Sequence, residues 1–159
     1  MNPGPDAFDP RVLVGAAMDL ATQAAARGDP PFGAVLADRS GRILVSAANA
    51  QVTSGDPTAH GEIELLRRAA EAGRPPPWRD LVVAVNAEPC SMCASALVKA
   101  EVGVIVFGAA HEPHMDPDLP LADVLARARR SPRVIDGVLA DAAAAQIAAA
   151  RAASNHPVD

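Results

Sequence analysis

Basic charge and aromatic rings are scarce in this sequence. It contains a single lysine, Lys99, no tyrosine, three phenylalanines and one tryptophan. Aspartate and glutamate outnumber lysine and arginine by 19 to 14, which gives a formal net charge of −5. Nucleic-acid grooves usually combine a basic surface with stacking rings. The composition therefore argues against a nucleic-acid partner.

Long apolar runs are also lacking, and the first residues give no reason to expect a targeting signal. No stretch is apolar and long enough to cross a bilayer. The first residues do not follow the basic, apolar and small-residue order of a signal peptide. We therefore expect no membrane partner and a cytoplasmic location.

Cysteine is limited to Cys90 and Cys93. One close pair cannot form the disulfide framework of a small secreted domain. The pair is a metal half-site, a redox pair or a chance spacing, and composition alone does not distinguish these three.

The length of 159 residues suits one domain, and half of the residues are apolar, so a sizeable core is available. Residues 1–9 are rich in proline, glycine and aspartate, and residues 154–159 are short and polar. Both ends are expected to be flexible. The folded domain is expected over residues 10–153.

Apolar periodicity predicts a helix over residues 10–27 and a hairpin of strands at 34–36 and 42–47. After the hairpin, helices and strands alternate, which favours parallel crossover connections. We expect a three-layer α/β/α fold, with helices on both faces of a five-stranded mixed sheet of order 2-1-3-4-5. The remaining expected elements are a helix entered at 56–58, a strand at 81–85, a helix at 91–100, a strand at 102–107, a helix at 121–130, a strand at 133–135 and a helix at 138–153.

Two short motifs carry chemistry. His60-Gly61-Glu62 opens the second long helix, and Pro89-Cys90-Ser91-Met92-Cys93 opens the third. Cys90 and Cys93 share one face of a helix near its N-terminus, where the helix dipole favours thiolates. Zinc binds cysteine and histidine, and catalytic zinc sites use three protein ligands and leave the fourth position to water. His60, Cys90 and Cys93 are therefore the predicted ligands of one Zn²⁺ per chain.

Glu62 is the predicted catalytic residue. A carboxylate beside the metal can take a proton from water, pass it to a ring nitrogen and protonate a departing amine. Glu64 is the rival carboxylate but lies further along the helix. His111 or His114 as a fourth ligand would make the zinc structural, and a Cys-x-x-Cys redox protein would bind no zinc. The pairing of H-x-E with P-C-x-x-C is the signature of zinc-dependent base deaminases.

Over roughly residues 10–150 the chain resembles the cytidine-deaminase superfamily, and within it the bacterial guanine deaminases and the tRNA adenosine deaminases. The matching pieces are Pro31-Phe32-Gly33-Ala34-Val35, Asn49, Asp56-Pro57-Thr58-Ala59-His60, Glu88-Pro89-Cys90-Ser91-Met92-Cys93 and Val106-Phe107-Gly108-Ala109. The resemblance implies a zinc-dependent hydrolytic deaminase, in which the backbone carbonyl of Glu88 meets the leaving amine and the side chain of Asn49 contacts the base. Gly61 is a departure, because both families usually carry alanine there; fungal cytosine deaminases resemble the chain at this point.

Further substrate contacts are expected from Phe32, which can stack on a flat base, and from the backbone near Ala59. His114, Asp116 and Asp118 are expected to close the pocket, with Glu112 as another candidate carboxylate. The expected substrate is a free amino-nucleobase: guanine, or a related amino-purine or aminotriazine.

Four alternatives to this function stay open. The first is a cytosine-type base or a nucleoside as substrate, and the second is adenosine-to-inosine deamination in tRNA. The others are a zinc-holding module without turnover and the redox protein described above. The resembling families commonly dimerise, so a homodimer is expected.

Overall fold

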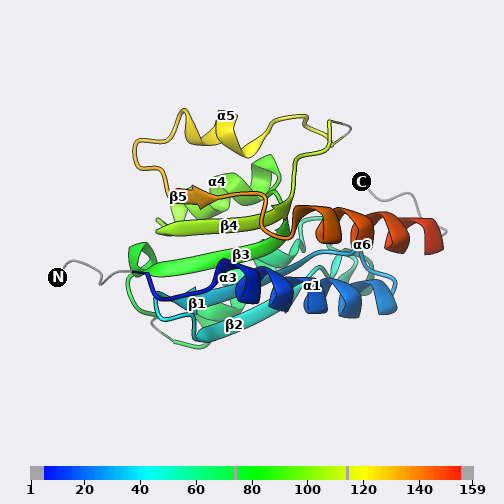
Figure 1. The fold of residues 1–159 in the computed structure, drawn as a ribbon, viewed down its shortest axis with the longest axis horizontal. Coiled ribbons are helices and arrows are strands. Elements are labelled where there is room, and N and C mark those ends of the chain that lie inside the picture. Colours follow the sequence, from blue (N-terminus) through cyan, green and yellow to red (C-terminus); the bar gives the residue numbers. More distant parts are fainter. Residues whose placement is uncertain (1–5, 74, 114, 155–159) are drawn as a thin grey trace.

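The computed structural model describes residues 6–73, 75–113 and 115–154. It shows a five-stranded mixed sheet of order β2-β1-β3-β4-β5, with α1 and α6 on one face and α3 and α4 on the other (Figure 1). The predicted fold class and strand order are confirmed. The helices are α1 (Pro10–Ala26), α2 (Gln51–Ser54), α3 (Gly61–Glu71), α4 (Ser91–Lys99), α5 (Leu121–Leu125) and α6 (Ala140–Ala153), with a 3₁₀ turn at Trp78–Asp80. The strands are β1 (Gly33–Asp38), β2 (Ile43–Ala48), β3 (Leu81–Ala87), β4 (Val104–Ala109) and β5 (Arg133–Ile135).

Two apolar layers enclose the sheet because successive side chains of a strand point to opposite faces. In β1, Leu36 joins the cluster that contains Leu97 of α4, while Val35 joins the cluster that contains Val14 of α1. The central strands are therefore buried on both faces, as the runs of valine in β3 and β4 predict.

The strand directions place the carboxyl ends of β3 and β4 side by side. β1 pairs antiparallel with β2 and β3, whereas β3, β4 and β5 are parallel. β3 therefore ends at Ala87 next to the end of β4 at Ala109, which are partners in the register. Loops at this edge of an open α/β sheet are where ligand sites form.

Some element ends are shifted by a few residues: α3 begins at Gly61 and not at 56–58, and β4 is Val104–Ala109 and not 102–107. Two further differences concern whole elements. The four-residue helix α2 was not predicted, because it has no apolar periodicity and depends on a distant residue, Asp29, for its cap. The Asp29 side chain accepts hydrogen bonds from the backbone N–H groups of Val52 and Thr53, both at 2.9 Å. The helix predicted over 121–130 ends at Leu125, since no long apolar side chain follows that could be buried against the sheet or α4.

Both chain ends are only partly described. Residues 1–5 and 155–159, which fall within the segments expected to be flexible, lie outside the described residues. The described part of the N-terminal segment is packed: Phe8 is buried in the cluster on the α1 side, and Asp9 caps α1 by accepting a hydrogen bond from Arg11 N at 2.9 Å. Among the described helices, none is long and apolar enough to span a membrane.

Candidate active site

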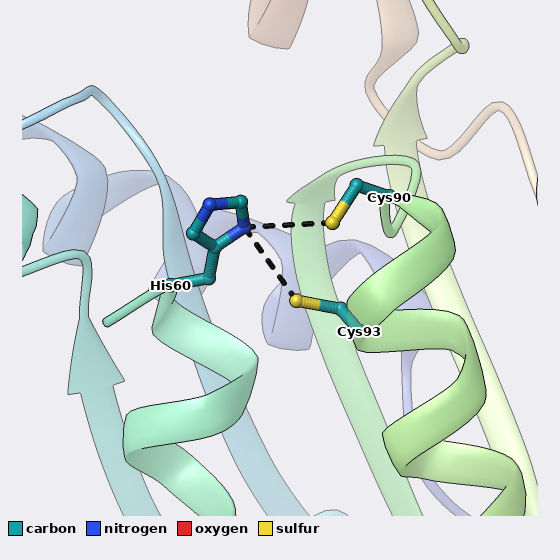
Figure 2. A group of neighbouring side chains, drawn as sticks. All are labelled: His60, Cys90 and Cys93. Atoms are coloured by element: carbon teal, nitrogen blue, oxygen red, sulfur yellow. Dashed lines mark hydrogen bonds between the residues drawn. The ribbon is translucent and has the colours of Figure 1, made fainter. Parts of the chain in front are cut away.

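Two helix starts meet beside the carboxyl end of β3. His60 is the residue immediately before α3, Cys90 is the residue immediately before α4, and Cys93 lies in the first turn of α4. Figure 2 shows the imidazole of His60 reaching across from α3 toward the two sulfur atoms of α4. The three ligand atoms lie within 4.8 Å of one another. The fold thus brings together the three residues predicted to hold zinc.

The spacing of these atoms fits a zinc ion. His60 Nδ1 lies 3.5 Å from Cys90 Sγ and 3.6 Å from Cys93 Sγ. Zn–N and Zn–S bonds of ordinary length in a tetrahedron place nitrogen and sulfur about 3.6 Å apart. Within the described residues the cluster has three members. His111 is not one of them, and its Nε2 lies 2.6 Å from Asp118 Oδ1. His114 lies outside the described residues.

Glu62 lies in the first turn of α3 and is buried, with 7 % of its surface exposed. Burial is the main cause that raises the pKa of Glu62, and the negative charge of Cys90 adds to it. A carboxyl group with a raised pKa gains and loses a proton closer to neutral pH, which is what a proton carrier needs. Glu64 differs, since it is paired at the surface with Arg67 at 2.7 Å.

The two thiols have different proton affinities. A hydrogen bond from Cys93, together with one from His60, lowers the pKa of Cys90 to about 4 despite its burial. The same hydrogen bond, with burial and the charge of Glu62, raises the pKa of Cys93. For His60 the largest influence is burial, which works to lower the pKa, but the hydrogen bond and charge of Cys90 and the charge of Glu62 raise it overall. Cys90 is therefore a ready thiolate ligand.

A pocket opens next to the three ligands. It is walled by residues from the β3 and β4 ends, the start of α4, the loop after β4, and α6. Of the predicted site residues, Phe32, His60, Glu62, Glu88 and Cys90 line it. The other lining residues are Gly33, Gln51, Val85, Asn86, Ala87, Ala109, Ala110, His111, Glu112, Met115, Ile147 and Arg151.

Several predicted substrate contacts are not part of this lining. Asn49 is fully buried, Ala59 is a buried residue of the loop that precedes α3, and Asp116 is exposed. His114 lies outside the described residues. The Glu88 side chain accepts hydrogen bonds from His111 N at 3.0 Å and Leu121 N at 2.8 Å, so it anchors the loop after β4.

Phe32 is held in place by contacts that the sequence pattern did not reveal. The buried side chain of Asn86 accepts a hydrogen bond from Gly33 N at 3.0 Å and donates one to Pro31 O at 2.9 Å. A Cβ on Gly33 would lie 2.3 Å from Ala17 O, so only glycine allows α1 to approach this closely. The backbone on both sides of Phe32 is thereby fixed.

Arg151 was also missed, because an arginine near the end of an alanine-rich helix carries no signal of its own. Its guanidinium carbon lies 5.9 Å from the centre of the Phe32 ring, and its NH1 donates to Glu112 Oε2 at 2.5 Å. α6 thus contributes a cation to the pocket wall, and this guanidinium group lies over the ring of Phe32. Only the folded structure places Arg151 of α6 beside Phe32, which lies in the loop between α1 and β1.

Gly61, the departure noted between His60 and Glu62, faces β1. A Cβ at this position would meet the backbone of Gly33 and Ala34 at 3.5 Å, which is ordinary van der Waals contact. An alanine is therefore accommodated here.

The comparison with protein families matches residues 10–109 to the model described as "Cytidine and deoxycytidylate deaminase zinc-binding region". The chain belongs to this family. The matched stretch contains His60, Cys90 and Cys93, and zinc is the metal that this family binds.

Curated relatives within the family include two kinds of deaminase. The chain is 39 % identical over 93 residues to a tRNA-specific adenosine deaminase of Haemophilus influenzae, covering 58 % of this chain and 54 % of the relative. It is 35 % identical over 81 residues to a guanine deaminase of Bacillus subtilis, covering 51 % of each. The match thus spans about half the length of these relatives.

A solved structure from a study of A-to-I editing by tRNA:A34 deaminases superimposes with a TM-score of 0.73 and 28 % identity, covering 85 % of this chain and 98 % of that chain. Relatives that act on tRNA therefore stand beside one that acts on guanine. The expectation that nucleic acid is not a partner receives no support from these relatives.

Proposed function

We propose that this protein hydrolytically removes the amino group of a free amino-nucleobase, guanine or a related amino-purine or aminotriazine, and releases ammonia. The observation that carries the proposal is the position of Glu62: a buried carboxyl group that lines the same pocket as two of the three zinc-binding residues.

The residues divide the chemistry between them. A zinc ion held by His60, Cys90 and Cys93 would supply the Lewis acidity that makes water nucleophilic near neutral pH. Glu62 accepts a proton as the water oxygen bonds to the ring carbon, and it transfers that proton to the adjacent ring nitrogen. It then carries the second proton of the water to the amino group as the C–N bond breaks. The products are ammonia and an oxo base, so atoms and charge balance.

The substrate side of the pocket suits a flat ring. Phe32 offers an aromatic face, Val85, Met115 and Ile147 add apolar surface, and a few polar groups remain to orient the base. In the mechanism we assign the carbonyl of Glu88 to the leaving amino group, as the family resemblance implies.

The charges around the pocket favour a neutral base over a polynucleotide. Among the described lining residues, Arg151 is the only arginine or lysine, and it is already paired with Glu112. The loop after β4 carries Glu112, Asp116 and Asp118 and no arginine or lysine between residues 110 and 120. Phosphates approaching over this loop would meet carboxylates.

Adenosine deamination in tRNA is the second candidate, because the relatives and the solved structure described above include tRNA-specific enzymes. It uses the same zinc site and the same role for Glu62. It differs in requiring contacts to the anticodon backbone, which impose a steep dependence of affinity on salt. A cytosine-type base stays a third possibility because of Gly61.

The test is ammonia release from guanine, cytosine and an anticodon stem-loop, each measured at several salt concentrations. We expect guanine to be deaminated much faster than the stem-loop, with weak salt dependence. Conversion of adenosine to inosine in the stem-loop with no turnover of any free base would overturn the proposed substrate and leave the zinc chemistry standing. Zinc-loaded protein that releases ammonia from none of these substrates would identify a binding module.

We also propose that the protein works as a cytoplasmic homodimer. The two zinc-binding thiols must stay reduced to act as ligands, which the cytosol ensures, and the resembling families commonly dimerise. Light scattering at micromolar concentration tests the assembly, and a monomer would contradict it.

A further inference from the structure

Gln51, rather than Asn49, presents an amide to the pocket. Asn49 lies at the end of β2 and has none of its surface exposed. Gln51, two residues later, is the first residue of α2 and lines the pocket together with His60 and Glu62. The side chain that is accessible to a base is therefore that of Gln51.

The orientations of both amides follow from one backbone hydrogen bond. Gln51 N donates to Asn49 Oδ1 at 2.9 Å, and only an oxygen can accept this bond. The other corner of the Asn49 amide is therefore Nδ2, which must donate to its neighbour at 2.6 Å. That neighbour is consequently the oxygen of Gln51, Oε1.

This arrangement leaves the Gln51 amide nitrogen for a ligand. Its oxygen is engaged by Asn49, while Nε2 has two N–H donors and no protein acceptor within the described parts of the chain. A polar group at a pocket wall with unused donors is suited to an acceptor atom on the ligand.

The backbone that carries Gln51 is held rigidly. Asp29, with 4 % of its surface exposed, accepts hydrogen bonds from Val52 N and Thr53 N, each at 2.9 Å. Arg27 donates to Asp29 at 3.2 Å and to Asn49 O at 3.1 Å. Arg27 and Asp29 together therefore hold residues 49–53 at both ends. A donor that is already fixed loses little conformational entropy when the ligand binds.

We propose that the amide nitrogen of Gln51 donates a hydrogen bond to an oxo oxygen or an unprotonated ring nitrogen of the base, and that Gln51 is a specificity-determining residue of this site. The inference rests on the proposed function and narrows its substrate class. Bases that present an acceptor to α2 are favoured, and bases that present an N–H group there are rejected, since two donors would face each other.

Gln51→Glu is the sharpest variant. A glutamate oxygen still accepts from Asn49 Nδ2, so the segment keeps its internal hydrogen bond, but the second oxygen replaces the donor by a charged acceptor. We expect kcat/KM for guanine to fall by about 10- to 100-fold, mainly through KM, because the contact is made equally in the ground and transition states. The melting temperature should stay within about 2 °C of the wild type.

Equilibrium binding gives a readout that does not depend on turnover. Hypoxanthine has the oxo group and ring nitrogens of guanine but no amino group to lose. Its Kd on zinc-loaded protein, measured by calorimetry, should rise by a similar factor in Gln51→Glu. Gln51→Leu, which removes the donor without adding charge, should weaken binding as well. Gln23→Glu, the same change on the exposed face of α1, is the matched control and should leave both constants unchanged.

The measured constants decide whether Gln51 contacts the base. If Gln51→Glu matches Gln23→Glu in KM and in hypoxanthine affinity, Gln51 does not contact the base. A fall in kcat with KM and Kd unchanged would also overturn the proposal, because it would place Gln51 in the chemical step. Failure of the wild type to release ammonia from any free base would instead refute the proposed function, and the inference with it.

Discussion

Asp29 binds Thr53 twice: one carboxylate oxygen accepts from the Thr53 backbone N–H and the other accepts from its hydroxyl group, both at 2.9 Å. The carboxylate thus caps α2 from a loop more than twenty residues earlier. Without it, the N–H groups of Val52 and Thr53, the second and third residues of α2, lose their acceptor.

We expect Asp29→Ala to lower the free energy of unfolding by about 1–3 kcal/mol, since charge-assisted hydrogen bonds to a buried carboxylate are lost. Asp19→Ala, an exposed aspartate on α1, should change it by less than about 0.5 kcal/mol. Urea denaturation of both variants measures the difference. Equal midpoints would show that the cap contributes nothing to stability.

Removing one metal ligand should abolish zinc binding. Purified wild-type protein is expected to carry about one zinc per chain, and Cys93→Ser about a tenth of that or less after dialysis, because two ligands do not retain the ion. Met92→Leu changes the neighbouring residue of α4 at nearly constant volume and should keep the metal. Elemental analysis decides, and wild-type protein that is free of zinc with its thiols oxidised would support the redox alternative.

Glu62→Gln should separate proton transfer from metal binding. The amide is nearly the same size but cannot carry the proton, so turnover should fall at least ~10²-fold while zinc content stays unchanged. Glu64→Gln, which alters a surface ion pair with Arg67, should be close to the wild type. Steady-state rates on the best substrate give the ranking, and the reverse order would show that the proton carrier is misassigned.

Gly61→Ala is expected to stabilise the fold. The added methyl group meets only ordinary contacts and raises the helix propensity of the first turn of α3, so the free energy of unfolding should increase by about 0.5–1 kcal/mol with zinc retained. Gly55→Ala should do the opposite, because Gly55 has a φ of +72° at the end of α2. Unfolding curves of the two variants test both changes in the free energy of unfolding. Destabilisation by Gly61→Ala would mean that the space between residue 61 and β1 is too small for a methyl group.

Local patterns predicted the features that depend on neighbours in the sequence. Apolar periodicity was sufficient for α1, and continuous valine-rich runs were sufficient for β3 and β4. The pairing of His60-Gly61-Glu62 with the Cys90 and Cys93 motif was sufficient to predict the metal site. Features that depend on distant partners were not predictable in this way. α2 requires Asp29, the pocket wall requires Arg151 of α6 beside Phe32, and the loop of Phe32 requires Asn86 of β3.

Asn49 is another residue whose environment the sequence did not reveal. A motif match identifies a residue but not the direction of its side chain. In the structure its amide hydrogen bonds to Gln51 and none of its surface is exposed. The contact of Asn49 with the base stays a prediction.

The lining of the pocket by α6 has a consequence for protein engineering. The three metal-binding residues all lie between residues 60 and 93, whereas the lining residues Glu112, Ile147 and Arg151 come from beyond the stretch that matches the family model. Lining residues such as Glu112 and Arg151 can therefore be varied without changing any of the three metal-binding residues. The pocket thus offers positions for changing ligand selectivity that are separate from the metal-binding residues, in addition to Gln51.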